Sequence, residues 1–204
     1  YSKLILDEIQ AYEPRVIATI IYGLKTIQEM GGHFAIITAT FPPVLKKFME
    51  KSGLSEGLQY QFKDFTEKEY QSDQFPRHKI RIEKSEVDIE EILEQGSTKK
   101  VLVICNTVSK AQKIYKEMRE RTENVELLHS CYIRRDRAFL EEKIMLFSEA
   151  EKPGIWITTQ IVEASLDIDF DMLYTEMCTA DSFLQRMGRC NRKGRYIPEE
   201  PNII

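Results

Sequence analysis

The end of the chain concentrates arginine and glutamine in the string Gln185-Arg186-Met187-Gly188-Arg189-Cys190-Asn191-Arg192. In a helix, Arg189 and Arg192 would lie three residues apart and share a face. Two guanidinium groups on one face can stabilise the charge that develops on a phosphoryl group during its transfer. A solvated helix face would explain the arginines, but it explains neither Gln185 nor Gly188, a residue that costs about 1 kcal/mol in a helix relative to alanine. The string therefore predicts a phosphate-contacting element.

Two adjacent carboxylates, Asp7 and Glu8, follow the short apolar run 4–6. Adjacent side chains at the end of a strand point in opposite directions, so one carboxylate can hold a hard cation while the other orients a water molecule. Hydrolysis of a phosphoanhydride needs both roles. A turn followed by a helix N-cap is the alternative explanation for such a pair.

Hydroxyl and carboxylate side chains also follow the apolar run 155–157, at Thr158, Thr159 and Asp167. Hydroxyl groups at the end of a strand can bind a phosphate backbone, and a nearby aspartate can reach a ribose or orient the arginines. A threonine-rich loop with a capping aspartate is the alternative.

Composition narrows the classes of function. The net charge is −4, so any contact with nucleic acid must come from a local basic cluster. The four cysteines and three histidines are scattered and form no zinc or redox motif. No apolar stretch approaches the roughly 20 residues that span a bilayer, and no signal peptide opens the chain, so we expect a cytoplasmic protein without membrane contact.

Periodicity in the first part of the chain predicts a strand, a helix, a second strand and a second helix, over residues 4–6, 14–30, 34–37 and 43–52. The continuous apolar runs are typical of strands that are buried on both faces. Residues 54–76 have no convincing period and predict an irregular connection. A succession of strand and helix favours a parallel sheet with right-handed crossovers.

The second part repeats this alternation more completely. It predicts strands over 78–84, 101–104, 125–128, 155–157 and 172–174, and helices over 87–95, after Thr107, over 134–147 and from about residue 180. Gly96 is expected to stop the helix over 87–95. The fold class is therefore α/β, with parallel sheets flanked by helices and with ligands expected at the carboxyl ends of the strands.

Four strings in this order resemble motifs II, III, V and VI of superfamily 2 helicases: residues 7–10, 38–40, 158–167 and 185–192. Their local sequences resemble the CRISPR-associated helicase-nuclease of type I interference systems, over essentially the whole chain. The resemblance implies RecA-like sheets, with the C-terminal half of a first helicase lobe in 1–76 and a second lobe in 77–204. It implies ATP and Mg²⁺ as cofactors and single-stranded DNA as the polymer that is moved.

The resemblance also implies a role for each matching residue. Asp7 would hold Mg²⁺ and Glu8 would orient the attacking water, while Gln10 and Gln185 would sense the γ-phosphate. Asp167 would lie near the ribose, and Arg189 and Arg192 would be arginine fingers. The residues expected to couple the lobes are Thr38 and Thr40, and those expected on the DNA are Thr107, His129, Ser130, Thr158 and Thr159. Cys131 departs from the basic residue that the family often carries after its His-Ser pair, which puts one phosphate contact in doubt.

A phosphate-binding P-loop is missing, because none of the nine glycines precedes a lysine. No His-Asp nuclease cluster is present either. We therefore expect a fragment that binds ATP poorly by itself, whose partners in the intact system are an HD nuclease domain, in the same or a separate chain, and the CRISPR surveillance (Cascade-type) complex. The alternatives are another superfamily 2 helicase acting on DNA or RNA, or a non-catalytic nucleic-acid-binding remnant of the fold.

Overall fold

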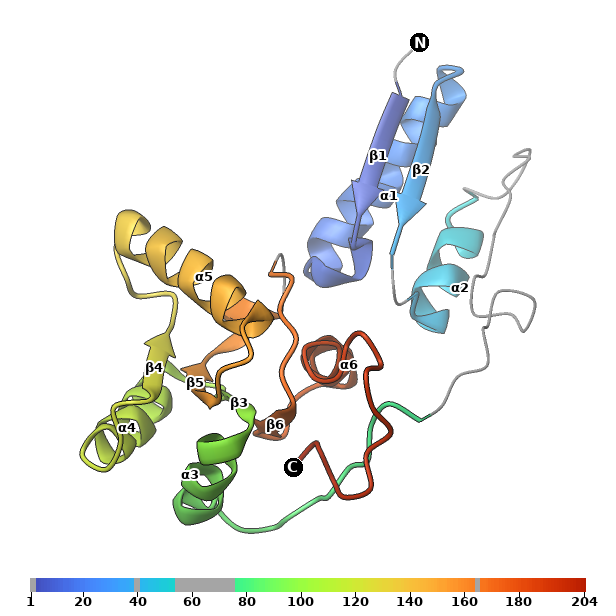
Figure 1. Ribbon diagram of the computed structural model, residues 1–204. Helices are drawn as coiled ribbons and strands as arrows, with labels where there is room; N and C mark the ends of the chain where they lie inside the picture. The colour runs from blue at the N-terminus through green and yellow to red at the C-terminus, as the bar shows by residue number, and fades with distance from the viewer. Residues whose placement is uncertain (1–2, 39–40, 54–75, 164–165) are drawn as a thin grey trace. The chain divides into compact units, whose positions relative to one another are not determined.

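The computed structural model describes residues 3–38, 41–53, 76–163 and 166–204, and these form two compact units, Tyr1–Gln71 and Ser72–Ile204. The connection expected over 54–76 lies outside the described residues, apart from its last residue. Each unit is α/β, as predicted (Figure 1).

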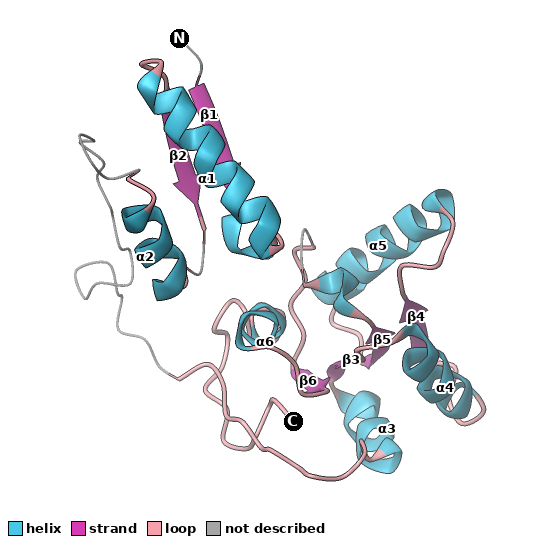
Figure 2. Cartoon of the chain, turned by 180° about the vertical axis from the view of Figure 1, so that it is seen from behind, coloured by secondary structure: helices cyan, strands magenta, loops and turns pink. Residues whose placement is uncertain are grey.

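Unit 1 contains β1 (Lys3–Asp7), the short 3-10 helix η1 (Ile9–Ala11), α1 (Pro14–Glu29), β2 (His33–Ile37) and α2 (Pro43–Lys51). β1 and β2 are parallel and in register from Lys3 opposite His33 to Asp7 opposite Ile37. α1 connects them and lies across one face of the pair in both ribbon views (Figures 1 and 2). The predicted strand-helix-strand unit is confirmed.

Local sequence explains where α1 begins and ends. Pro14 occupies the first helical turn, where its missing N–H costs no hydrogen bond. Gly31 adopts a φ of 75° directly after the C-cap, a conformation that glycine adopts without strain. The N–H groups of Gly31 and Gly32 then donate to the carbonyls of Gln28 and Ile27. This pair of bonds is the Schellman pattern that satisfies the last carbonyls of a helix.

The prediction that the strands of unit 1 are buried on both faces is wrong. Exposed and half-buried residues alternate along β1 and β2, and Ile5 and Ile37 are 69% and 61% exposed. Leu4, Leu6, Phe34 and Ile36 face a small core under α1 and α2. α1 and α2 pack on this same core, and among the described residues nothing covers the opposite face of the β1–β2 pair.

Unit 2 is larger, with a four-stranded parallel sheet in the order β4-β5-β3-β6. Its strands are β3 (Lys100–Ile104), β4 (Val125–Leu128), β5 (Gly154–Thr158) and β6 (Met172–Thr175). Its helices are α3 (Ile89–Thr98), α4 (Val108–Arg119), α5 (Arg134–Glu149), the 3-10 helix η3 (Gln160–Val162) and α6 (Ala180–Met187). The four core strands and their helices were predicted within a few residues.

Helices cover both faces of this sheet. Val101 and Val103 of β3 face a core with α3 and α4, whereas Leu102 and Ile104 face a second core with α5. Every residue of β3 and β5 is buried. Alternate residues of one strand thus belong to two different cores. The unit has three layers, helix on sheet on helix.

Two predicted elements of unit 2 differ from the structure. The strand expected over 78–84 is reduced to a single bridge between Ile80 and Ile203. α3 does not stop at Gly96 but passes through it to Thr98, because Gly96 is where the helix lies against β5. A Cβ built there would come within 2.3 Å of Ile155 Cγ1, so glycine permits the close approach. Among the described helices, none is long and apolar enough to cross a membrane.

Candidate functional site

Three predicted site residues of unit 1 meet at the carboxyl end of β1. Gln10 Nε2 donates a hydrogen bond to Glu8 Oε2. Thr38 Oγ1, which follows β2, lies 2.6 Å from Gln10 Oε1 and 3.3 Å from Glu8 Oε2. Residues from two separate strings therefore form one polar cluster. Thr40, predicted beside Thr38, lies outside the described residues.

The backbone at Glu8 departs from the extended conformation of β1. Glu8 has a φ of 49°, in the left-handed region that non-glycine residues seldom adopt. Its N–H donates to Ile37 O at 2.9 Å, which fixes this turn to the end of β2. As a result Asp7 is exposed while Glu8 is half-buried in the cluster. The two carboxylates thus differ in exposure, and their separate roles stay a prediction.

Asp7 offers a free-standing oxygen ligand of the kind that hard cations prefer. No group of three or more His, Cys, Asp or Glu side chains among the described residues could hold a metal ion. The exposed carboxylate of Asp7 could contribute one ligand to a hard cation such as Mg²⁺.

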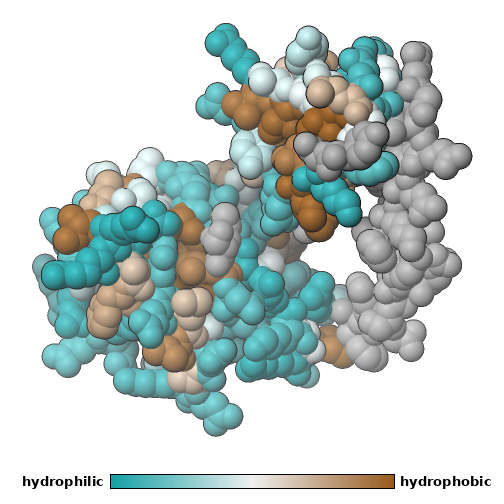
Figure 3. Space-filling model, turned by 90° about the horizontal axis from the view of Figure 1, so that it is seen from above, coloured by the Kyte–Doolittle hydropathy of each residue, from teal (hydrophilic) through white to brown (hydrophobic). Residues whose placement is uncertain are grey.

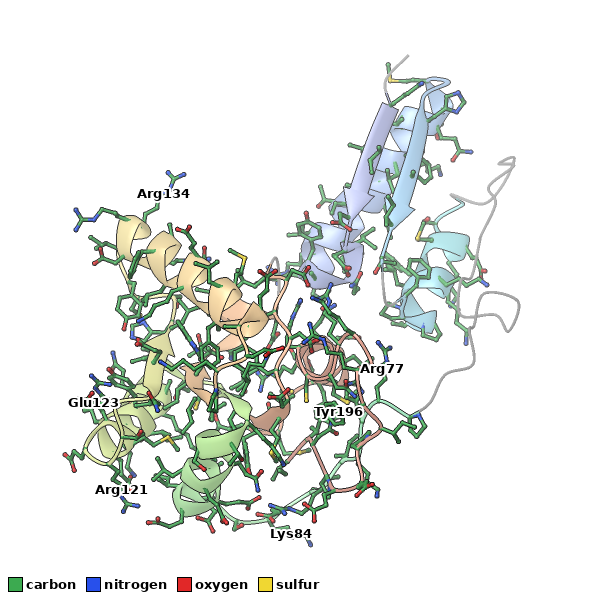
Figure 4. The ribbon with its side chains drawn as sticks, in the orientation of Figure 1. Arg77, Lys84, Arg121, Glu123, Arg134 and Tyr196 are labelled. Carbon is green, nitrogen blue, oxygen red and sulfur yellow. The ribbon has the colours of Figure 1, made fainter. Side chains whose placement is uncertain are left out.

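The helix predicted to carry Arg189 and Arg192 ends before either residue. α6 stops at Met187, with Gly188 as its C-cap, and Cys190 forms a bridge with Phe170. Asn191 then has a φ of 44°, and its amide donates to the carbonyls of Arg77 and Tyr196, both labelled in Figure 4. The prediction of a shared helix face is therefore wrong, since bonds to other segments draw the chain out of the helix.

Arg189 is buried in a loop of its own unit. Its Nη2 donates to Glu163 O at 2.6 Å and its Nη1 donates to Leu166 O, while its Nε is buried without a partner among the described residues. Burial, together with the nearby charge of Arg192, lowers the pKa of Arg189. In this structure the guanidinium binds main-chain carbonyls of the segment that follows η3.

Arg192 and Asp167 meet at the surface. Arg192 Nε lies 3.3 Å from Asp167 Oδ1, and the side chains are 43% and 77% exposed. The Arg192 N–H donates to Asp169 Oδ1 at 2.7 Å, which anchors the main chain. Gln185 is half-buried on the last turns of α6. Two residues that the sequence assigned to the same nucleotide are thus adjacent, and both are accessible.

The residues predicted on the DNA all lie at or just beyond the carboxyl ends of β3, β4 and β5, which are neighbours in the sheet. Thr107 caps α4 after β3 and accepts the Lys110 N–H at 3.2 Å. Thr107 and Ser130 are exposed. Thr158 is fully buried and donates to Val103 O at 3.2 Å, and Thr159 is buried as well. The structure thus brings the set to one edge of the sheet, but it leaves only part of the set open to a ligand.

His129 is also buried, and its neighbours hold its ring. Its Nδ1 accepts the Cys131 N–H at 3.2 Å, its Nε2 lies 3.2 Å from the Gln112 amide, and Tyr132 stacks on it with ring centroids 4.3 Å apart. Burial lowers the pKa of His129 and favours the neutral ring. The ring supports the loop that presents Ser130.

Sequence reasoning missed a buried polar network centred on Arg186. This side chain, only 1% exposed, binds Glu163, Thr175, Asn106 and the Glu176 carbonyl. A signal was present, because Arg186 lies three residues after Phe183, whose side chain packs on the core from the same helix. That spacing places the arginine on the buried side of α6.

The chain is similar to known proteins in sequence and in fold. Residues 97–195 match the family described as CRISPR-associated nuclease/helicase Cas3, C-terminal. A CRISPR-associated nuclease/helicase Cas3 of Methanothermobacter thermautotrophicus is 34% identical over the whole chain, which covers 26% of that protein. The CRISPR-associated endonuclease/helicase Cas3 of Escherichia coli is 29% identical over 97% of the chain, which covers 26% of its length.

Solved structures agree on the fold. T. fusca Cas3 with AMPPNP superposes with a TM-score of 0.76 at 18% identity, over 97% of this chain and 28% of that one. S. cerevisiae Dbp5 bound to RNA and ADP BeF3 gives 0.65 at 16% identity, over 98% and 52% of the two chains. The chain spans about a quarter of the length of the curated relatives it matches. Over its whole length the chain is similar to one segment of CRISPR-associated nuclease/helicase Cas3 proteins, and it shares the RecA-like fold of that segment.

Proposed function

We propose that this chain is part of an ATP-driven helicase that moves along single-stranded DNA and delivers it to an HD nuclease domain in CRISPR interference. The observation that carries the proposal is the similarity to Cas3 proteins over the whole chain. A CRISPR RNA-guided surveillance complex in a pre-nicking state contains a chain of the same fold, with a TM-score of 0.70. A Cascade-type complex is therefore the proposed partner.

In this proposal the carboxyl end of β1 serves the nucleotide. Asp7, exposed at the strand end, would contribute a ligand to Mg²⁺. Glu8 would orient the attacking water, and Gln10 and Thr38, which both donate to Glu8 Oε2, would fix the orientation of the carboxylate. Bound ATP with Mg²⁺ would supply the free energy for movement.

Gln185, Arg189, Arg192 and Asp167 would serve the same nucleotide from unit 2. Arg192 is ready for this role because its side chain is partly exposed and its ion pair with Asp167 is a surface pair worth only about 0–1 kcal/mol. Arg189 must first exchange its bonds to two main-chain carbonyls for bonds to phosphate. Hydrogen bonds to charged groups contribute about 1.5–3 kcal/mol each, so breaking these two bonds costs substantial free energy before bonds to phosphate replace them.

The DNA side would combine direct and indirect roles. Thr107 and Ser130 are exposed and would contact the phosphate backbone without regard to sequence. His129, Thr158 and Thr159 are buried, so we assign them to holding these loops, with any DNA contact made by their main chain. Thr40 keeps its proposed role in coupling the lobes, together with Thr38.

The proposal is tested in the full-length protein with Arg192→Ala. Arg192 is preferable to Arg189 because its loss opens no buried site. We expect ATP turnover stimulated by single-stranded DNA to fall by about 10³- to 10⁵-fold, as is typical of arginine fingers, with DNA binding nearly unchanged. Lys193→Ala, the exposed neighbour, is the matched control. Turnover within a few-fold of wild type would refute the assignment, and stimulation by RNA alone would favour an RNA helicase instead.

A further inference from the structure

Arg186 lies where three loops of unit 2 converge. Its Nε donates to Glu163 Oε1 at 2.8 Å, beyond η3. Its Nη1 donates to Thr175 Oγ1 at 2.8 Å and to Glu176 O at 3.2 Å, at the end of β6. Its Nη2 donates to Asn106 Oδ1 at 2.9 Å, after β3. One side chain of α6 thus joins the segments that follow β3, β5 and β6.

The fork shape of the guanidinium makes this arrangement possible. Arginine carries five N–H donors in a fixed plane, whereas lysine carries a compact ammonium that cannot reach three separated segments. The Arg186 side chain is 1% exposed and that of Glu163 is 15% exposed, so water contributes little here. Removing one partner of such a buried pair leaves an uncompensated charge. The geometry of the three loops therefore depends on this residue.

The network reaches further on the side of β3. Glu176 accepts the Asn106 N–H at 2.5 Å and the Lys110 Nζ at 2.7 Å. Asn106 also accepts from Gln160 Nε2 at 2.8 Å through its carbonyl, and it immediately precedes Thr107. Movement of the loop that carries Thr107 would therefore disturb the partners of Arg186.

Glu163 connects the same network to the proposed nucleotide side. Its carboxylate binds Arg186 while its carbonyl binds Arg189 Nη2 at 2.6 Å. A shift of Glu163 thus changes the bonds that hold Arg189 in its buried position. Arg186 therefore binds two segments at once. One contains Asn106 and leads to Thr107 on the proposed DNA side, and the other contains Glu163, which holds Arg189 of the proposed ATP side.

We infer that Arg186 is a positioning residue that couples occupation of the DNA loops to release of Arg189 toward the nucleotide. This inference rests on the proposed function and adds a regulatory residue to it. Among the described residues the partners of Arg186 are Glu163, Thr175, Glu176 and Asn106, so we assign it a positioning role and not a catalytic one. A purely structural role would affect stability and basal turnover alike, whereas a coupling role affects the response to DNA.

The test uses the full-length protein and the variants Arg186→Gln and Arg186→Lys. The measured quantity is the ratio of ATP turnover with and without saturating single-stranded DNA. We expect this ratio to fall by about 5- to 150-fold, the range of typical coupling between sites. The affinities for AMPPNP and for DNA should stay within about threefold of the wild-type values. Arg121→Gln is the control, because Arg121 pairs with Glu90 at the surface.

Two further variants keep the inference testable if Arg186 variants do not fold. Thr175→Val and Asn106→Ala each remove one partner of the guanidinium without removing a charge. Each should lower the stimulation ratio in the same direction with basal turnover retained. A ratio equal to wild type in these folded variants would overturn the coupling role. A wild-type protein without DNA-stimulated turnover would instead overturn the proposed function, and the coupling role with it.

Discussion

The sheets of the two units use strands of similar length and composition but bury them very differently. β1 and β3 are both five residues long and largely aliphatic. Every residue of β3 is buried, whereas no residue of β1 is. The difference comes from the layers, because helices cover both faces of the sheet in unit 2 and the described helices of unit 1 share a single core. Apolar surface thus remains exposed in unit 1, and Figure 3 shows such surface in brown.

This difference predicts unequal stability. Hydrophobic burial contributes roughly 25 cal/mol per Å² of apolar surface, so a strand buried on one face gains much less than one buried on both. Local opening starts where buried contacts are few. We therefore expect unit 1 to open at lower denaturant concentration than unit 2.

The largest effect is expected from truncating one buried strand residue in unit 2. Leu102→Ala removes a side chain with 0% exposure at the centre of the sheet and should destabilise unit 2 by about 2–5 kcal/mol. Ile5→Ala, the counterpart in unit 1, removes a side chain that is 69% exposed and should change stability by less than about 0.5 kcal/mol. Urea unfolding of the 204-residue chain measures both.

The two units can be followed separately in that experiment. Trp156, in the core of unit 2, is the only tryptophan, so its fluorescence reports unit 2 alone. Hydrogen exchange in α1 reports unit 1. Equal losses for Leu102→Ala and Ile5→Ala would show that the exposed face of β1 is covered in solution, and the comparison would fail.

Sequence periodicity was sufficient for the element order in both units. Apolar runs and glycine stops predicted the strand-helix alternation because these signals are local. Burial of a strand is not local, since it depends on which helices return to each face. The run 4–6 looks like the run 101–104, yet only the latter is buried on both sides. Gly96 failed as a stop signal for the same reason, because its role is contact with Ile155.

The candidate site was predictable to the level of residue type and strand end. Glu8, Gln10 and Thr38 form a cluster at carboxyl ends of strands, as expected, and Arg192 meets Asp167 in the segments that follow α6 and precede β6. The course of the chain after Gly188 was not predictable, because partners distant in sequence, Phe170 and Arg77, decide it. The buried network of Arg186 likewise depends on three loops that only the fold brings together.

The glycines inside α1 and α3 extend the comparison, because their replacement by alanine should change stability in opposite directions. A Cβ at Gly23 of α1 would meet nothing within 4 Å, so Gly23→Ala should stabilise unit 1 by about 0.5–1 kcal/mol through helix propensity. A Cβ at Gly96 of α3 would meet Ile155 Cγ1 at 2.3 Å, so Gly96→Ala should cost about 1–3 kcal/mol of overpacking. Thermal unfolding with the two probes above measures each change.

A double variant tests the reason for the cost at Gly96. Ile155→Ala removes the clashing atoms, so Gly96→Ala should be much less harmful in that background than in the wild type. Additive costs would mean that the cost of Gly96→Ala does not come from the Ile155 side chain. Destabilisation by Gly23→Ala would mean that the open side of α1 is occupied.

The smallest effect is expected from the pH dependence of the Glu176 cluster in unit 2. Burial opposes ionisation of Glu176, but hydrogen bonds from Lys110 and the Asn106 N–H outweigh it and lower the pKa of Glu176 below its ordinary value of 4.5. Folding therefore favours the carboxylate, and its stabilisation is complete well above pH 4.5 and is lost as the pH falls through the lowered folded value. Both side chains of the ion pair are about one-third exposed, so this stabilisation is at most about 1 kcal/mol.

Glu176→Gln removes this dependence while keeping the shape of the side chain. Between about pH 6 and about pH 3, unit 2 of the wild type should therefore lose up to about 1 kcal/mol more stability than the variant, measured by urea unfolding with Trp156 fluorescence. Glu90→Gln is the matched control, because its 76% exposed carboxylate also pairs with a cation but is screened by water. Exchange in α1 should follow the same pH course in all three proteins, since Glu176 belongs to the other unit. Identical slopes for the wild type and Glu176→Gln would mean that Lys110 and Asn106 do not stabilise the carboxylate in solution, and the network proposed around Arg186 would keep only the direct bond from Arg186 to Asn106 as its contact with the loop that carries Thr107.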